Sequence, residues 1–300
     1  MKKIISLLVS IAIMLSVAVP AFANDSTSDI DVIAYSPEFP DAYLEYGDFT
    51  PATQYIVEDG KQILGSVAVT AFCEEAYNTE TGEVLYSRLM TKDEVDAWEA
   101  EGSSSEPVPL ATWGDVASKG KLNIELVVFQ LANDGTSGYN TNLWARARAN
   151  WSGGPVLTQG STCPSWGEDV IGLSWSHGLD GFNRKQTATS NKGDKVQINM
   201  SDYSRYKYVT WEFVEQFGTL GLGYASSIEC STGLGVPTSV YNQKADIAMT
   251  YSHSYSNIVI DDLTFSVSAS DKGWGGGLEI SFGKEVDAWS IVAIADRIDL

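Results

Sequence analysis

The sequence predicts a mainly β protein: an antiparallel β-sandwich or jelly roll, preceded by a small region made of one hairpin and one short helix. Nine or ten runs place apolar residues at every second position, and turn residues separate the runs. The composition, with 27 Gly, 14 Tyr and 9 Trp among 300 residues, favours strands and turns over helices. One polar face on each run indicates antiparallel rather than parallel sheets.

Residues 1–23 have the pattern of a secretory signal peptide. Lys2 and Lys3 precede an apolar run from Ile4 to Val19, and Ala21-Phe22-Ala23 fits the small-x-small pattern of a cleavage site. We therefore expect export from the cytosol into a compartment in which disulfides can form. No later apolar run in the sequence is long enough for a membrane-spanning helix.

Three segments are expected between the signal peptide and the main domain. Residues 24–60 are acidic, contain three prolines and lack a period, which predicts an extended or disordered segment. Residues 61–102 predict a β-hairpin followed by a short helix, because Thr91-Lys92-Asp93-Glu94 forms a capping box and Gly102 can end the helix. Residues 103–112 are rich in Ser and Pro and read as a linker.

Residues 113–300 are expected to form the β-sandwich domain. The candidate strands are Leu122–Leu131, Leu143–Trp151, Ile171–Trp175, Lys195–Met200, Val209–Phe213, Leu220–Tyr224, Ala245–Tyr255, Leu263–Val267, Leu278–Phe282 and Trp289–Ile294.

The charge excludes one class of partner. The net charge is −20, and residues 24–102 alone carry 18 acidic and 3 basic residues. Such a chain repels phosphate backbones, so we expect no nucleic-acid binding. Residues 184–207 depart from this pattern with six basic and two acidic residues. They could contact the acidic segment or an anionic envelope polymer, or they could form a solvated hairpin.

The three cysteines allow at most one internal bridge. Cys163 and Cys230 both lie at expected strand edges of one domain, so a Cys163–Cys230 disulfide is predicted. The alternative is that Cys73, Cys163 and Cys230 are all small buried hydrophobic residues.

No catalytic residue is assigned. His177 and His253 are the only histidines, no Gly-x-Ser-x-Gly elbow is present, and ligand spacing for zinc is missing. No cofactor is expected, except that calcium is kept as a candidate because Asp134 and Asp180 lie in oxygen-rich runs that otherwise read as turns.

Aromatic residues give the candidate ligand site. A row of exposed rings on a sheet stacks on the apolar faces of sugars. Candidate rings for such a row are Trp144, Tyr206, Tyr208, Tyr251 and Tyr255, and the alternative is that these rings fill the core.

The sequence therefore predicts a secreted bacterial, non-catalytic binding protein that recognises carbohydrate or a cell-envelope polymer, either outside the cell or at its envelope. A secreted polysaccharide hydrolase using two carboxylates is one alternative. A β-pore-forming or membrane-active protein, suggested by the alternation from Ala245 to Ser270, is another. The oligomeric state is left open.

Overall fold

The structure is a computed structural model. It describes residues 34–35, 44–46, 49–77, 84–102, 118–132, 139, 141–152, 168–176, 178–214, 216–217, 223–240, 243–254, 262–270, 273–281 and 288–299. The signal peptide, the linker at 103–112, and His177, Cys163, Asp134 and Tyr255 lie outside these ranges.

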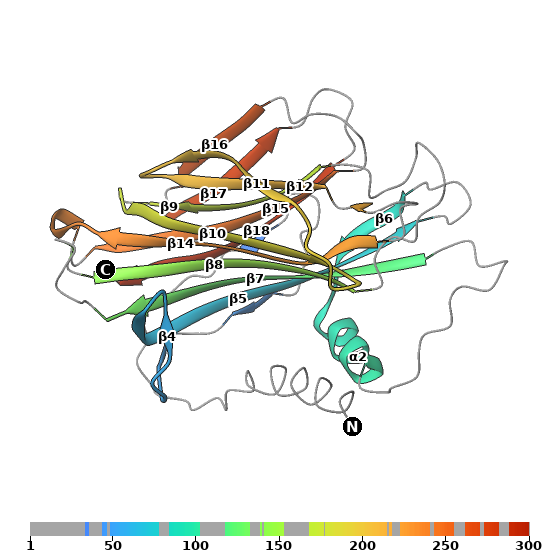
Figure 1. The fold of residues 1–300 in the computed structure, drawn as a ribbon, viewed down its shortest axis with the longest axis horizontal. Helices are drawn as coiled ribbons and strands as arrows, with labels where there is room; N and C mark the ends of the chain where they lie inside the picture. Colours follow the sequence, from blue (N-terminus) through green and yellow to red (C-terminus); the bar gives the residue numbers. More distant parts are fainter. Residues whose placement is uncertain are drawn as a thin grey trace. The chain divides into compact units, whose positions relative to one another are not determined.

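Two antiparallel sheets confirm the predicted fold class (Figure 1). The smaller sheet has six described strands in the order β1-β18-β15-β9-β12-β11, and the larger has the order β10-β14-β8-β7-β5-β2, with β3, β4, β6 and β13 paired at its sides. The strands of the smaller sheet are β1 (Ala34–Tyr35), β9 (Glu168–Trp175), β11 (Ile198–Ser204), β12 (Tyr208–Val214), β15 (Lys244–Ser254) and β18 (Ala288–Asp299). The strands of the larger sheet are β2 (Leu44–Tyr46), β3 (Thr50–Pro51), β4 (Val57–Glu58), β5 (Lys61–Tyr77), β6 (Val84–Leu89), β7 (Ser118–Leu131), β8 (Thr141–Ser152), β10 (Asp180–Ser190), β13 (Gln216–Phe217) and β14 (Gly223–Val236).

The main core lies between the two sheets, as the period-2 alternation requires. On β8, Ala145, Ala147 and Ala149 are fully buried and pack with Ile171 of β9 and Met249 of β15 in the same cluster. Small alanines on one sheet thus face larger side chains on the other, which lets the layers interdigitate at native density.

The predicted boundary between residues 61–102 and the main domain is not where the fold divides. β5 pairs with β7 from Ile63 to Tyr77, and Val67, Val69 and Ala71 contribute to the same core as the rest of the sandwich. Residues 31–300 accordingly form one compact unit. The alternation in β5 revealed a strand and its hairpin to β6, but it did not reveal the long-range pairing with β7.

Helix α2 (Lys92–Gly102) begins at the predicted capping box. The Thr91 amide donates to the Glu94 carboxylate at 2.9 Å, which is the expected reciprocal bond, whereas the Thr91 hydroxyl also donates to that carboxylate instead of accepting from the helix. Val95 and Trp98 face β5, where Phe72 meets the Trp98 ring edge-on at 5.9 Å. This contact attaches the helix to the outer face of the larger sheet.

A corner of the chain brings the two sheet edges together. After β9 the chain crosses to the larger sheet and becomes its edge strand β10, and it then returns to form β11, the edge of the smaller sheet. The β11–β12 turn closes this corner, because the amides of Trp175 and Gly181 donate to the carbonyls of Lys207 and Arg205, each at 2.8 Å. The turn at residues 205–207 is thereby held against both sheets.

Two further strands, β16 (Asp262–Ser270) and β17 (Gly273–Ser281), pair only with each other. By contrast, β15 is a central strand between β9 and β18, and ten of its eleven residues are buried. The alternation from Ala245 to Ser270 is therefore divided between a buried core strand and a separate hairpin. Among the described residues, no helix is both long and apolar enough to cross a bilayer.

Candidate functional site

Three exposed side chains and the half-buried Arg184 gather at the corner where β10 and β11 run along the sheet edges. We call Arg184, Tyr203, Arg205 and Tyr206 the Arg–Tyr surface. Tyr203 and Tyr206 are each 53% exposed, a large fraction for an aromatic residue that lies beside a sheet. The predicted candidate Tyr206 belongs to this group, although it lies in the turn rather than on a strand.

The guanidinium group of an arginine lies over each tyrosine ring of this surface. The Arg184 group lies 4.5 Å from the centre of the Tyr203 ring, and the Arg205 group lies 5.5 Å from that of Tyr206. These are cation–π distances. Because both rings remain more than half exposed, each pair still presents an aromatic surface to solvent.

A buried carboxylate anchors the surface from below. Arg205 donates through Nε and Nη2 to the two oxygens of Asp180, and the Tyr139 hydroxyl donates to the same carboxylate. The Arg205 guanidinium, with help from Tyr139, holds the pKa of Asp180 below its ordinary value. The Tyr139 ring can approach because the register partner of Asp180 is Gly235, where a Cβ would stand 2.8 Å from the ring.

Asp180 therefore has a different role from the predicted one. Both of its oxygens accept hydrogen bonds from Arg205 and Tyr139, so a calcium ion would have to displace a cation that is already bidentate. No group of three or more Asp, Glu, His or Cys side chains suitable for a metal occurs among the described residues. Asp134 lies outside them, so a calcium site there stays a prediction.

Tyr208 is oriented by Asp202 of β11. Its hydroxyl donates to Asp202 at 2.6 Å, and this hydrogen bond is the main reason that its pKa rises to about 12. The ring is half-buried, so Tyr208 borders the Arg–Tyr surface and does not extend it.

Two other predicted ligand-binding rings are buried, contrary to their assumed exposure. Trp144 has no exposed surface and packs with Ile63, Val127 and Phe129 on the outer face of the larger sheet. The Lys185 ammonium lies 4.7 Å from its ring centre. Tyr251 is also fully buried. The alternation correctly placed Trp144 on the opposite face of β8 from Ala145, Ala147 and Ala149. This outer face is not exposed, because other residues of the chain pack over it.

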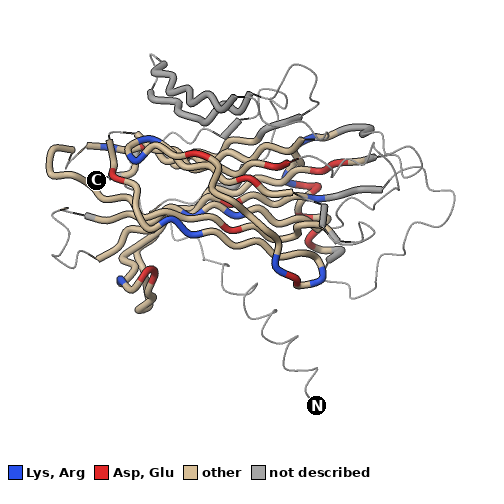
Figure 2. The backbone as a smooth tube through the Cα atoms, turned by 45° about the horizontal axis from the view of Figure 1, so that its top comes forward, with Lys and Arg blue, Asp and Glu red and all other residues tan. Residues whose placement is uncertain are grey.

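The cover of Trp144 comes from the predicted acidic segment. In the β4–β5 turn, Asp59 and Gly60 adopt positive φ values, and the Asp59 carboxylate accepts from Lys185 at 2.9 Å and from Asn183 at 3.0 Å. Lys185 of the basic residues 184–207 thus contacts Asp59 of the acidic residues 24–60. In Figure 2 acidic and basic residues are interspersed along the described strands, so short ion pairs of this kind are available locally.

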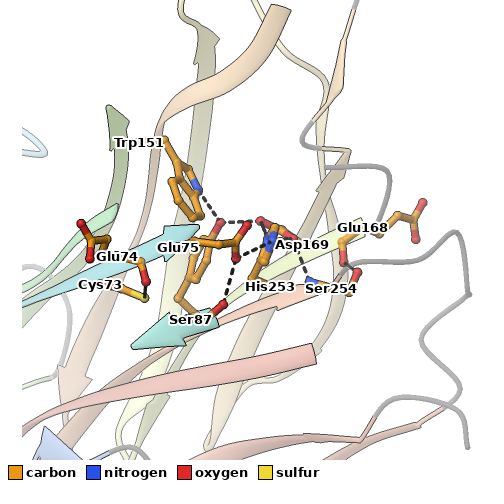
Figure 3. Close-up of polar contacts among 10 residues, drawn as sticks. Cys73, Glu74, Glu75, Ser87, Trp151, Glu168, Asp169, His253 and Ser254 are labelled. Carbon is orange, nitrogen blue, oxygen red and sulfur yellow. Dashed lines mark hydrogen bonds and ion pairs between the residues drawn. The ribbon is translucent and has the colours of Figure 1, made fainter. Parts of the chain in front are cut away.

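A second polar cluster lies inside the sandwich (Figure 3). His253 Nδ1 lies 3.0 Å from Asp169, and His253 Nε2 lies 3.5 Å from Glu75. The Tyr251 hydroxyl donates to Asp169 and accepts from the Trp151 indole at 2.9 Å. We call Glu75, Asp169, Tyr251 and His253 the buried cluster.

The buried cluster follows from the same alternation that builds the core. On β5, Glu75 continues the inward row Val67, Val69, Ala71 and Cys73. Asp169 precedes Ile171 in the inward row of β9, and His253 follows Tyr251 in that of β15. Because Tyr251 is the register partner of Ile171, Asp169 and His253 are neighbours two residues further along.

Sequence reasoning did not identify this cluster, although one signal for it was present. An ionisable residue at a position that the period assigns to the core needs a partner, because an unpaired buried charge is costly. Glu75, Asp169 and His253 are at most 1% exposed, so no substrate reaches the imidazole in this structure. The two carboxylates also lie at opposite nitrogens of the ring and cannot converge on one metal ion.

The structure does not confirm the predicted disulfide. Cys73 and Cys230 are free and buried, and burial raises the pKa of both thiols. Cys163, the predicted partner of Cys230, lies outside the described residues.

The hydrolase alternative has one suggestive residue. Burial raises the pKa of Glu212 on β12, and the charge of Glu168 on the neighbouring strand β9 adds to the effect. A general acid for glycoside hydrolysis needs a raised pKa of this kind, together with a second carboxylate at a defined separation.

Comparisons with known proteins give no family. No family model matches the chain, and no curated protein matches it. Among solved structures, it is similar to the Fap1 fimbriae of Streptococcus parasanguinis at 10% identity, covering 59% of this chain and 80% of that chain, with a TM-score of 0.27. It is also similar to the delta-toxin of Clostridium perfringens at 9% identity, covering 80% and 93%, with a TM-score of 0.29. A third is the T6 backbone pilin of Streptococcus pyogenes at 10% identity, covering 75% and 60%, with a TM-score of 0.29. With TM-scores below 0.5, these similarities carry no argument about function.

Proposed function

We propose that this chain is an exported, non-catalytic binding protein and that the Arg–Tyr surface recognises carbohydrate or an anionic polymer of the cell envelope. The single observation that carries the proposal is the pairing of two exposed tyrosine rings with two guanidinium groups at one corner of the sandwich. Export is supported by the signal-peptide pattern of residues 1–23.

The chemistry of the surface suits a sugar polymer with acidic groups. Tyrosine rings present apolar area to the C–H faces of sugars. The Nε/Nη2 fork of Arg205 is occupied by Asp180, and the Nη1 group of the same guanidinium can donate to a carboxylate or phosphate of a ligand. Neighbouring Lys207 is exposed and adds positive potential in a protein that is otherwise acidic.

The surface is also held in place before binding. Arg205 is bonded to buried Asp180, and the 205–207 turn is bonded to β9 and β10 through main-chain hydrogen bonds. A preformed site loses less conformational entropy on binding than a flexible one.

The test is a binding measurement with residues 24–300. Peptidoglycan sacculi with and without attached anionic polymers, and neutral glucans, are incubated with the protein and with the Tyr203→Ala/Tyr206→Ala variant. We expect at least a tenfold loss of binding in the variant, and weaker binding of the wild type as salt increases.

Tyr55→Ala is the matched control, because Tyr55 is 75% exposed and lies outside the Arg–Tyr surface. It should bind like the wild type. Equal binding by the double variant and the wild type would reject the surface, and absence of binding to every polymer would reject the function.

The hydrolase remains a second candidate because of the raised pKa of Glu212. Release of reducing ends from a panel of polysaccharides, abolished in Glu212→Gln, would support it. No turnover of any substrate would remove it.

A further inference from the structure

The imidazole of His253 lies between carboxylates from both sheets. Asp169 belongs to β9 of the smaller sheet, as His253 does through β15, whereas Glu75 belongs to β5 of the larger sheet (Figure 3). One ring nitrogen faces each carboxylate, at 3.0 Å and 3.5 Å.

The ring and both carboxylates are shielded from bulk solvent. Glu75, Asp169 and His253 are at most 1% exposed, and the Trp151 ring of β8 lies 5.6 Å from the imidazole. The nearby Cys73 thiol reports the same environment, because its pKa is raised first by burial and then by the charge of Glu75. Two carboxylates buried together need a compensating positive charge.

Further described polar groups lie around the ring on the neighbouring strands. On β5, Glu74 faces the other way and pairs with Arg88 of β6 at 2.9 Å. On β6, the Ser87 hydroxyl donates to Glu75 at 3.2 Å, and on β15 the Tyr251 hydroxyl donates to Asp169. The Ser254 amide donates to Asp169 at 3.2 Å. None of the groups donating to Glu75 or Asp169 in these bonds is a cation.

We propose that His253 is a doubly protonated imidazolium at neutral pH, that it ties the two sheets together, and that it makes the stability of the sandwich depend on pH in the neutral-to-alkaline range. Nδ1–H donates to Asp169, and Nε2–H faces the Glu75 carboxylate at an ion-pair distance of 3.5 Å. A neutral ring has one N–H and would leave one buried carboxylate without a donor from the imidazole.

The sign of the pH effect follows from the unfolded chain. There the ring is solvated and loses its proton above about pH 6.5. In the folded protein the two carboxylates retain the proton to higher pH. The tie therefore stabilises the fold fully below about pH 6.5, and this stabilisation is lost as the pH rises through the value at which the folded ring deprotonates.

The chain offers a clean measurement because it has only two histidines. In a His177→Gln variant, His253 is the one remaining imidazole, and its ring nitrogens can be followed by ¹⁵N NMR in the full protein. We expect both nitrogens to be protonated at pH 7.5, where a solvated histidine is only about one-tenth charged. A neutral ring at pH 7.5 overturns the proposal.

A second measurement tests the consequence for stability. Thermal unfolding is recorded from pH 5.5 to pH 9 for the wild type, His253→Gln and the control His177→Gln. The wild type and the control should lose several degrees of Tm between pH 6.5 and pH 9, and His253→Gln should start lower and lose less. Identical pH profiles for all three proteins would contradict a stabilising charge on His253 between the two sheets. Should His253→Gln not fold, the NMR measurement decides alone.

Discussion

The buried cluster and the Arg–Tyr surface are both built from ionic groups, but they differ in where those groups lie. Around His253 the imidazole and both carboxylates are hidden. At the Arg–Tyr surface the Asp180 carboxylate is buried, whereas the side chain of Arg205 is 59% exposed. In our two proposals these pairings serve different purposes: fully buried charges link the layers, and charges with one exposed partner remain available to a ligand.

Removing a carboxylate from the buried cluster should have the largest effect on stability. Asp169→Ala removes the partner of Nδ1 and of the Tyr251 hydroxyl, and leaves His253 buried with one fewer partner. We expect the free energy of unfolding to fall by about 3–5 kcal/mol. Urea unfolding measures it, with exposed Asp194→Ala as the control. If Asp169→Ala lowers the free energy of unfolding no more than Asp194→Ala does, the buried cluster does not stabilise the fold more than an exposed charge.

Tyr251→Phe should have a smaller effect, because it removes one hydroxyl and keeps the ring. The Trp151 indole loses its acceptor and Asp169 loses one donor. We expect a destabilisation of about 1–3 kcal/mol. The same urea titration checks this value. A neutral result would mean that water replaces the hydroxyl, and that the cluster is less closed than its exposure indicates.

Asp180→Asn should destabilise less again, because solvent screens its partner Arg205. We expect Tm to fall by about 2–4 °C at pH 7. Since the pKa of Asp180 is lowered, its contribution is complete above the unfolded value of about 3.9 and disappears as the pH falls through the folded value. Wild type and variant should therefore converge in Tm as the pH falls below the lowered pKa of folded Asp180. A constant difference across this range would show that charge is not the cause.

Tyr206→Ala should change stability least, by less than about 0.5 kcal/mol, because the ring is more than half exposed. We expect this substitution to weaken polymer binding instead. Differential scanning calorimetry beside the polymer-binding assay separates the two. A large fall in Tm would show that Tyr206 supports the fold, and would weaken its assignment to the ligand surface.

Much of the fold could be predicted from local patterns. The alternation of β8, β9, β12 and β15 placed these strands to within a few residues. The capping box at Thr91 marked the start of α2. β10 was not predicted as a strand, because Asp180–Ser190 mixes polar and basic residues and has only two buried positions after Gly181. An edge strand needs little apolar surface and so produces little periodicity.

The candidate site was predicted only in part. Tyr206 was identified as a ligand-binding residue, but the guanidinium partners Arg184 and Arg205 were identified only as part of a basic stretch. Trp144 was expected to be exposed, and the turn containing Asp59 covers the face on which it lies. Whether the polar face of a strand meets water or another segment depends on contacts between residues far apart in the sequence.

The sequence by itself determined which side chains point inward along each strand, since a strict period of two is a local property of the extended backbone. It also placed Glu75, Asp169 and His253 at inward positions of three separate strands. Only the tertiary structure decided that these positions coincide, because the register between β9 and β15 and the stacking of β5 over them arise from packing across the whole sandwich. The same packing set Asp180 beneath Arg205, which are 25 residues apart in the chain.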